Sequence, residues 1–138
     1  MRYIPAYSIL AGNYQYTSKK GNIVNPSQKM FTSWVQAVSV LRNTCAHNSR
    51  IYNRTIHTTP EILDVDKLTP PPAHNGLYQI LLAMKYLRSS DEEWTLFVDE
   101  IDKLFQNNSR VISLAAMNLP TDWKAHLSVS NQLYCIRY

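Results

Sequence analysis

Apolar side chains recur at three- and four-residue intervals in three stretches of the chain, which is the spacing of amphipathic helices with a buried face. The first stretch contains Phe31, Trp34, Val35, Val38, Leu41 and Cys45. The second contains Leu77, Ile80, Leu81, Met84 and Leu87. The third contains Trp94, Phe97, Val98, Ile101, Leu104 and Phe105. We predict a helix over each stretch, the first of them buried on more than one side.

Capping signals set the limits of these helices. Asn25-Pro26 predicts the start of the first helix, because asparagine is a strong N-cap and proline fits the first helical position. This helix should end at about His47 or Asn48. Ser90 and Glu93 form a capping box in front of the third helix, which should end at about Asn107.

The segments between and after the helices carry turn and breaker signals. Prolines interrupt residues 58–75, so we predict a long connection there with a short turn over residues 61–68. A further short helix is expected over residues 111–117, and the tail from Trp123 onward should be irregular or extended. Helices dominate and no hairpin signal or internal repeat is visible, so the sequence predicts an all-α bundle.

The first 25 residues differ from the rest in composition. They contain Tyr3, Tyr7, Tyr14 and Tyr16 together with Lys19 and Lys20. Such tyrosines either pack against the body of the domain, which we favour, or stack on the bases of single-stranded RNA. We therefore divide the chain into a tyrosine-rich basic segment, residues 1–25, and a helical domain, residues 26–138.

Hydropathy and cysteine usage limit the class of protein. No apolar run approaches the roughly 20 residues that cross a bilayer, so we expect no membrane partner and a cytoplasmic location. Cys45 and Cys135 form no C-x-x-C pair for zinc, and we expect both thiols to be reduced and buried.

Charge is distributed unevenly along the chain. Residues 1–60 contain seven Lys and Arg residues and no Asp or Glu, whereas the rest contains seven basic and ten acidic residues. A basic half favours a polyanionic partner, because each neutralised phosphate releases condensed counterions. A solvated surface without any partner explains the same charge equally well.

The strongest candidate for chemistry is Arg42-Asn43-Thr44-Cys45-Ala46-His47, at the end of the first predicted helix. Asn43 and His47 lie about 40° apart on the helix, whereas Arg42 and His47 lie about 140° apart. His47, titrating near pH 6.5 if unperturbed, would exchange a proton with the ribose 2′-OH or the leaving 5′ oxygen. Arg42 would bind the phosphate and stabilise the transition state, with Asn43 orienting the imidazole.

A purely structural interpretation of Arg42 and His47 remains open. Arg and His at this spacing also occur by chance, and the pair would then close a helix end, with Arg42 bonded to carbonyls and His47 enclosed in the core. His57, His74 and His126 are expected in loops without carboxylate or cysteine neighbours at ligand spacing, so we expect no metal site.

A longer block around the motif resembles a known family. Ser33-Trp34-Val35 leads into residues 41–54, L-R-N-T-C-A-H-N-S-R-I-Y-N-R. This block resembles the signature of the Abi-like (abortive-infection) family of bacterial phage-defence proteins, a branch of the HEPN superfamily. Residues 117–123, M-N-L-P-T-D-W, are similar to that family's M-G-F-P-x-x-W or M-G-L-P-x-x-W, with Asn118 in place of the usual glycine.

The resemblance implies a HEPN-like helical bundle and a metal-independent endoribonuclease site, with Arg42 and His47 as the catalytic pair and Asn43 as their polar companion. The residues that follow match the block as candidates for RNA contact or for helix-end structure: Arg50, Tyr52, Asn53 and Arg54. The implied partners are RNA, a second copy of the chain, and an antitoxin or guide RNA; no cofactor is implied.

The resemblance begins at about residue 26 and covers the carboxy-terminal half of longer family members, so dimerisation would complete the bundle. The alternatives are a non-catalytic RNA-binding or protein-interaction module and a truncated remnant.

Overall fold

The structure is a computed structural model, and it describes residues 14–18, 20–52, 54–68, 76–129 and 135–136. The elements, in chain order, are β1 (Tyr14–Thr17), β2 (Ile23–Val24), α2 (Gln28–Ala46), η1 (Asp64–Asp66), α3 (Leu77–Leu87), α4 (Asp91–Asn107), η2 (Ala115–Met117), α5 (Trp123–Leu127) and β3 (Cys135–Ile136). The helices dominate, which confirms the all-α class. The predicted turn over residues 61–68 is present as η1.

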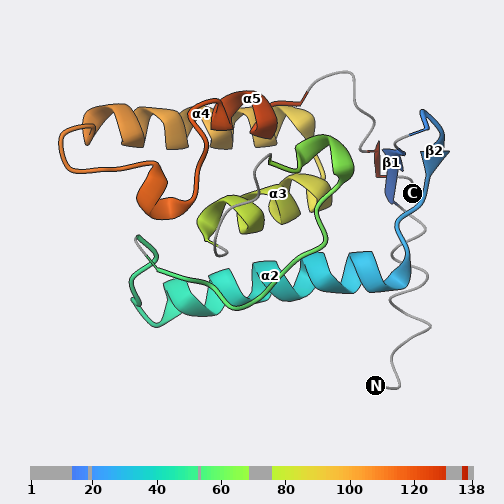
Figure 1. The fold of residues 1–138 in the computed structure, drawn as a ribbon, viewed down its shortest axis with the longest axis horizontal. Helices are drawn as coiled ribbons and strands as arrows, with labels where there is room; N and C mark the ends of the chain where they lie inside the picture. Colours follow the sequence, from blue (N-terminus) through green and yellow to red (C-terminus); the bar gives the residue numbers. More distant parts are fainter. Residues whose placement is uncertain (1–13, 19, 53, 69–75, 130–134, 137–138) are drawn as a thin grey trace.

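The helices form layers, with α3 in the middle (Figure 1). Helix α2 lies along one side of α3, and α4 and α5 lie along the other. Eight of the eleven residues of α3 are buried, including Ile80, Leu82 and Tyr86, because neighbours cover this helix on opposite sides. Trp34 of α2 reaches this core and stacks at a tilt on Tyr86, with ring centroids 4.9 Å apart. The layered arrangement leaves the outer side of α2 facing away from the core.

A small antiparallel sheet stands beside the start of α2, in the strand order β2-β1-β3. The sequence shows no hairpin signal, yet β1 and β2 pair antiparallel, with Tyr16 opposite Val24. Strands of two to four residues are too short for an alternating pattern to show in the sequence. The hairpin turn contains Gly21, whose φ of 87° favours glycine.

The first long helix starts two residues later than predicted. The Ser27 hydroxyl caps α2 by accepting a hydrogen bond from the Met30 N–H at 3.1 Å. Asn25 was expected in that role, but its side-chain amide donates to the Tyr14 carbonyl at 2.7 Å and holds the sheet instead. The helix ends at Ala46, within a residue or two of the predicted end.

The predicted N-cap of the third long helix is confirmed. Ser90 caps α4, its hydroxyl accepting from the Glu93 N–H at 3.2 Å. The helix runs to Asn107, as its apolar spacing and the following asparagines predicted.

Two predictions about the last third of the chain were wrong. Residues 111–117 do not form a short α-helix; within them only Ala115–Met117 is helical, as the 3-10 turn η2. The tail after residue 122 is not wholly irregular, because residues 123–127 form α5. Helix α5 is held from outside, since Trp94 Nε1 donates to the Leu127 carbonyl at 2.6 Å and Lys85 Nζ donates to the His126 carbonyl at 2.7 Å. Contacts this distant in the sequence leave no local pattern.

A buried polar group lies where η1 meets α3. The carboxylate of Asp66, only 3 % exposed, accepts a hydrogen bond of 2.6 Å from the Tyr86 hydroxyl. That hydroxyl also accepts from the Leu63 N–H at 3.3 Å, and the Tyr78 hydroxyl donates to the Asp66 carbonyl at 3.3 Å. These bonds satisfy polar atoms that burial removes from water.

Burial also shifts two ionisable groups on α3. It raises the pKa of the Tyr78 hydroxyl, and the negative charges of Asp66 and Asp122 add to this effect. It lowers the pKa of the Lys85 ammonium, a change that nearby Asp66 opposes and Arg88 reinforces. Both groups belong to the core and lie on α3. None of the helices in the described part of the chain combines the length and the apolar character needed to cross a membrane.

Candidate functional site

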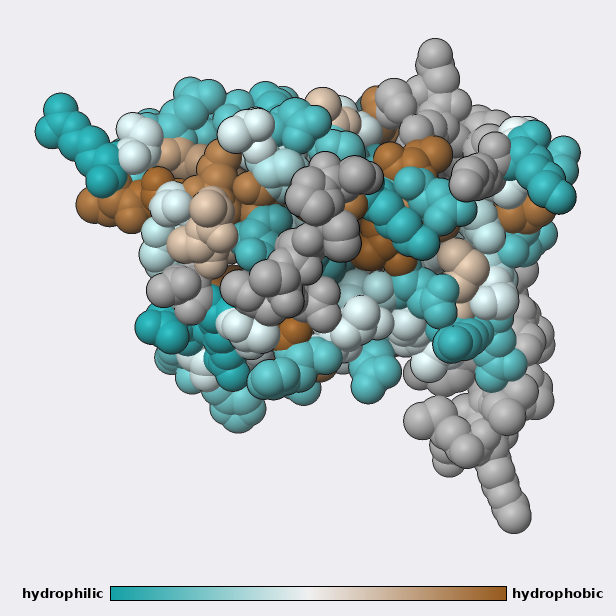
Figure 2. All heavy atoms as spheres, in the orientation of Figure 1, coloured by the Kyte–Doolittle hydropathy of each residue, from teal (hydrophilic) through white to brown (hydrophobic). Residues whose placement is uncertain are grey.

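The three motif residues lie on the surface at the carboxy-terminal end of α2. Arg42, Asn43 and His47 are all exposed. Arg42 Nη1 donates to Asn43 Oδ1 at 3.2 Å, so the guanidinium leans toward the asparagine. The His47 N–H donates to the Asn43 carbonyl at 3.1 Å, which continues the helical hydrogen bonding to the C-cap. In Figure 2 hydrophilic side chains cover the bottom edge of the molecule, along α2 and at its end.

The backbone after the motif adopts a specific helix-terminating geometry. Asn48 has a φ of 53°, in the left-handed region that asparagine tolerates better than most residues. The Asn48 N–H donates to the Cys45 carbonyl at 3.1 Å, and the Ser49 N–H donates to the Thr44 carbonyl at 3.0 Å. These two bonds form a Schellman motif, which satisfies the last helical carbonyls and turns the chain sharply. The turn fixes the backbone of His47 at the helix end.

His47 is open to solvent. Within the described residues its imidazole makes no hydrogen bond or ion pair, and the side chain is exposed. The interpretation in which His47 is enclosed in the core, with Arg42 bonded to carbonyls, therefore differs from the structure. Cys45 is also exposed and free, so the prediction of a buried thiol there was wrong. It lies about 20° around the helix from the buried Trp34, so the apolar stripe of α2 extends past the core at this end.

The segment after the helix folds back onto another part of the molecule. Arg50 and Arg54 are exposed, and Arg54 Nη1 donates to the Arg50 carbonyl at 3.2 Å. The Tyr52 hydroxyl accepts from the Ser113 N–H at 2.9 Å and lies 3.5 Å from the Val111 carbonyl oxygen. Asn53, which was predicted to contact RNA, lies outside the described residues. The Tyr52 hydroxyl is thus used in a contact within the protein, although Tyr52 was one of the four candidates for RNA contact.

The hydrogen bond between Ser113 and Tyr52 places the loop after α4 beside the segment that follows the motif, a neighbour that the sequence did not predict. The loop after α4 carries Arg110, an exposed cation. Sixty-one residues separate Tyr52 from Ser113, and no local spacing or motif connects them. The only signal in the sequence was that residues 103–121 contain no Asp or Glu, as in the first sixty residues.

Of the other three histidines, His126 lies in a different place from the one predicted. His57 is exposed, and His74 lies outside the described residues. His126 was expected in a loop without carboxylate neighbours, but it belongs to α5. Its Nε2 lies 3.2 Å from Asp122 Oδ2, four residues earlier at the N-cap of the same helix, and its Nδ1 lies 4.0 Å from Asp66 Oδ1 of η1. Among the described residues no three His, Cys, Asp or Glu side chains form a group that would hold a metal ion.

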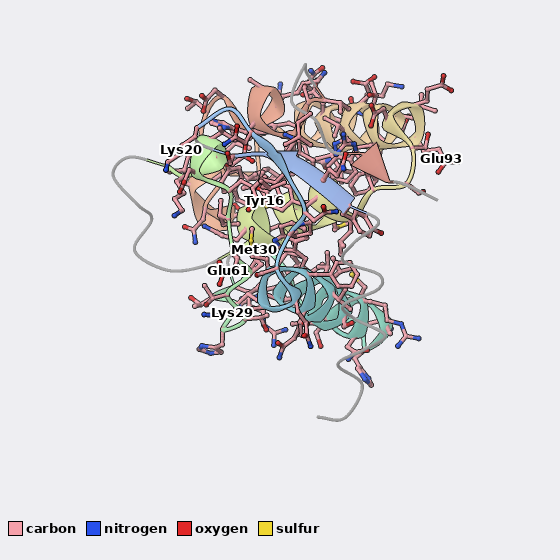
Figure 3. All side chains as sticks on the ribbon, turned by 90° about the vertical axis from the view of Figure 1, so that its right-hand side faces the viewer. Tyr16, Lys20, Lys29, Met30, Glu61 and Glu93 are labelled. Atoms are coloured by element: carbon pink, nitrogen blue, oxygen red, sulfur yellow. The ribbon has the colours of Figure 1, made fainter. Side chains whose placement is uncertain are left out.

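The opposite end of α2 carries a different set of groups. Lys29, in the first turn, pairs with Glu61 at 3.7 Å, and the Tyr16 hydroxyl lies 3.7 Å from the Met30 sulfur (Figure 3). A pocket of about 220 Å³ opens there between Met30, Tyr16 and the segment around η1. Lys29 and His47 are separated by about 27 Å of helix, at 1.5 Å per residue. The motif and this pocket are therefore separate places.

Part of the chain matches a family of known proteins. Residues 5–53 match the model of a family described as Abi-like protein. The match begins inside the tyrosine-rich segment and ends just past Tyr52, so it contains the whole Arg42 to His47 motif. Residues 117–123, which also resemble that family, lie outside it. No curated protein and no solved structure matches the chain.

Proposed function

From the match of residues 5–53 to the Abi-like family, we propose that this chain is a metal-independent endoribonuclease of phage defence. The block around the motif resembles that of bacterial phage-defence proteins, which supports this role. The proposed site is the exposed end of α2.

The observation that carries the proposal is the joint exposure of Arg42, Asn43 and His47 on one helix end. An RNA strand needs direct access to a cation and a proton-transfer group, and nothing described covers either of them. Arg42 supplies a permanent charge and a planar set of donors for a phosphate. Among the residues that the structure describes, the imidazole of His47 has no hydrogen-bond partner, so it can meet a ribose hydroxyl or a leaving oxygen.

The reaction is a transesterification in which the ribose supplies the nucleophile. The 2′ oxygen attacks the adjacent phosphorus and the bond from phosphorus to the 5′ oxygen breaks, leaving a 2′,3′-cyclic phosphate and a 5′ hydroxyl. One proton leaves the 2′-OH and one reaches the departing oxygen, and His47 serves one of these transfers. Arg42 stabilises the charge on the phosphoryl oxygens as it develops. DNA lacks the 2′-OH and cannot react by this route.

A second copy of the chain would complete the site. One imidazole supplies one proton transfer at a time, whereas this reaction needs an acid and a base. A HEPN-like homodimer with its two α2 ends together across a two-fold axis would bring two histidines and two arginines to one phosphodiester. An antitoxin or guide RNA acting on this open surface would control the activity.

The test compares cleavage by the purified protein and two variants, with EDTA present throughout. We expect His47→Ala to lower the rate on single-stranded RNA by about 10² or more, the usual contribution of one acid–base group. Arg42→Ala should lower it by about 10²–10³, the usual contribution of one group that stabilises transition-state charge. His57→Ala, another exposed histidine, is the matched control and should cleave like the wild type. The side chains of Arg42, His47 and His57 are all exposed, so each substitution should change the free energy of unfolding by no more than about 0.5 kcal/mol. Equal cleavage by the wild type and both motif variants would exclude this mechanism.

The exposed arginines Arg42, Arg50 and Arg54 also fit a non-catalytic RNA-binding module. The observation that favours it is the continued exposure of Arg50 and Arg54 beyond the motif. In that case the wild type binds RNA with a strong dependence on salt, and the RNA stays intact at every protein concentration.

A further inference from the structure

The loop between α4 and η2, residues 108–114, is joined to the segment that follows the motif. The Tyr52 hydroxyl bridges them, by accepting from the Ser113 N–H at 2.9 Å and lying 3.5 Å from the Val111 carbonyl oxygen. Tyr52 follows His47 by five residues, so at most about 18 Å of backbone separates the two. The loop therefore lies within the span of a few nucleotides from the proposed site.

The loop itself has a defined shape. The Val111 and Ile112 N–H groups donate to the Asn108 carbonyl at 2.9 and 3.0 Å, which closes a turn with Ser109 and Arg110 at its tip. The Asn108 side chain donates to the Leu104 carbonyl at 2.8 Å and ties the turn to the end of α4. Arg110 is exposed at this tip. Its backbone is fixed at both ends, by α4 and by Tyr52, so less conformational entropy is lost on binding.

Charge on the two joined segments is of one sign. Residues 103–121 contain Lys103 and Arg110 and no Asp or Glu. Residues 42–57 contain Arg42, Arg50 and Arg54 and again no carboxylate. The fold thus brings together two stretches that are 61 residues apart and both free of acidic side chains. A surface of this kind attracts a polyanion from two sides.

We propose that the 108–114 loop is the second wall of the RNA-binding surface, and that Arg110 contacts a backbone phosphate of the strand cut at Arg42 and His47. This inference rests on the proposed function. Single-stranded RNA suits the arrangement because its flexible backbone can follow from the helix end to the loop. Tyr52 is a positioning residue here, since its hydroxyl holds the loop and its partly exposed ring stays beside the path of the strand.

The test measures binding of a fluorescent single-stranded RNA by anisotropy at several salt concentrations, in the full chain carrying His47→Ala so that the RNA stays intact. We expect Arg110→Gln to weaken binding by up to about fivefold, the upper end for an exposed ion pair. It should also reduce the slope of log affinity against log salt by about 0.7, the value for one phosphate contact on a single strand. Lys29→Gln removes the same charge at the other end of α2 and should change neither quantity.

A conservative variant separates positioning from charge. Tyr52→Phe keeps the aromatic ring and removes only the hydroxyl, so the loop loses its anchor. We expect weaker binding in Tyr52→Phe, and a smaller effect of Arg110→Gln in that background than in the protein with Tyr52 intact, because the two residues act through one loop.

The outcomes distinguish this inference from the proposed function. If Arg110→Gln and Lys29→Gln bind alike, the loop is not a wall of the site, and the cleavage test still decides the nuclease. If Arg110→Gln weakens binding and lowers the salt slope while the His47-intact protein leaves RNA whole, the loop inference stands and the cleavage mechanism fails. Additive effects of Tyr52→Phe and Arg110→Gln would overturn the positioning role of Tyr52.

Discussion

At the scale of single residues, two asparagines take backbone angles that few side chains tolerate. Asn48 and Asn118 have φ values of 53° and 57°, and they follow α2 and η2 respectively. Asn118 stands where the family that the chain resembles usually has glycine, and the positive φ explains both choices. Asn118 also packs closely on Gly76: a Cβ added there would lie 2.9 Å from Asn118 Nδ2, so this pairing depends on glycine.

Tyr86 gives a prediction at the same scale. Its hydroxyl donates to Asp66 Oδ2 at 2.6 Å and accepts from the Leu63 N–H at 3.3 Å. Tyr86→Phe keeps the ring and leaves two buried polar groups short of a partner, so we expect the free energy of unfolding to fall by about 1–3 kcal/mol. Urea denaturation measures this change.

Tyr16→Phe is the matched control for that substitution. The Tyr16 hydroxyl contacts only the Met30 sulfur, at 3.7 Å, among the hydrogen bonds of its described surroundings. Sulfur is a weak acceptor, so the loss should stay below about 0.5 kcal/mol. If Tyr16→Phe and Tyr86→Phe proved equally stable, the Asp66 group would be contributing nothing to folding.

At the scale of elements, the start of α2 depends on a side chain that the sequence pattern passed over. Asparagine followed by proline is the stronger local signal, but Asn25 is used by the sheet and the cap falls to Ser27. The helix begins where the chain leaves the sheet, so the tertiary position of β1 decides between two good capping residues.

Substitution of the cap tests this assignment. Ser27→Ala should lower the free energy of unfolding by about 1 kcal/mol, whereas Ser27→Gly should lower it by only a few tenths, because glycine leaves the helix end open to water. Thermal or urea unfolding of the two variants measures the difference. A larger loss for glycine than for alanine would mean that Ser27 acts through something other than the cap.

At the scale of the whole molecule, α5 ties the layers together. This five-residue helix accepts hydrogen bonds from Lys85 of α3 and Trp94 of α4, and its Leu127 side chain is completely buried. On the solvent side, Lys124 pairs with Asp99 and Asp102 of α4 at 3.3 and 2.8 Å. The pKa of Asp102 is lowered, mainly because its carboxylate accepts a hydrogen bond from Lys124.

Removal of the Leu127 side chain should therefore destabilise the whole domain. Leu127→Ala opens a cavity where α5 packs, and we expect a loss of about 2–5 kcal/mol, a large part of a typical stability of about 5–15 kcal/mol. Leu96→Ala is the control, because Leu96 is 65 % exposed and its loss should cost under about 0.5 kcal/mol. The two thermal midpoints report the difference, and similar midpoints would show that α5 is peripheral.

Local sequence determined the long helices of this protein and the identity of its motif. The apolar spacing around Trp34 and Trp94 reflects burial on one face of a helix, and such a repeat is visible without knowledge of the partner. The block around Arg42 and His47 was likewise legible from residue types and order. These features depend on residues that are neighbours in the chain.

Tertiary structure alone decided what surrounds them. The exposure of Cys45, the contact of His126 with Asp66 and the packing of α5 depend on where distant segments lie. The hydrogen bond from Ser113 to Tyr52, which places Arg110 beside the segment after the motif, spans 61 residues. Loops are shaped by whichever backbone groups find partners, and those partners come from remote parts of the chain, so no local period records them.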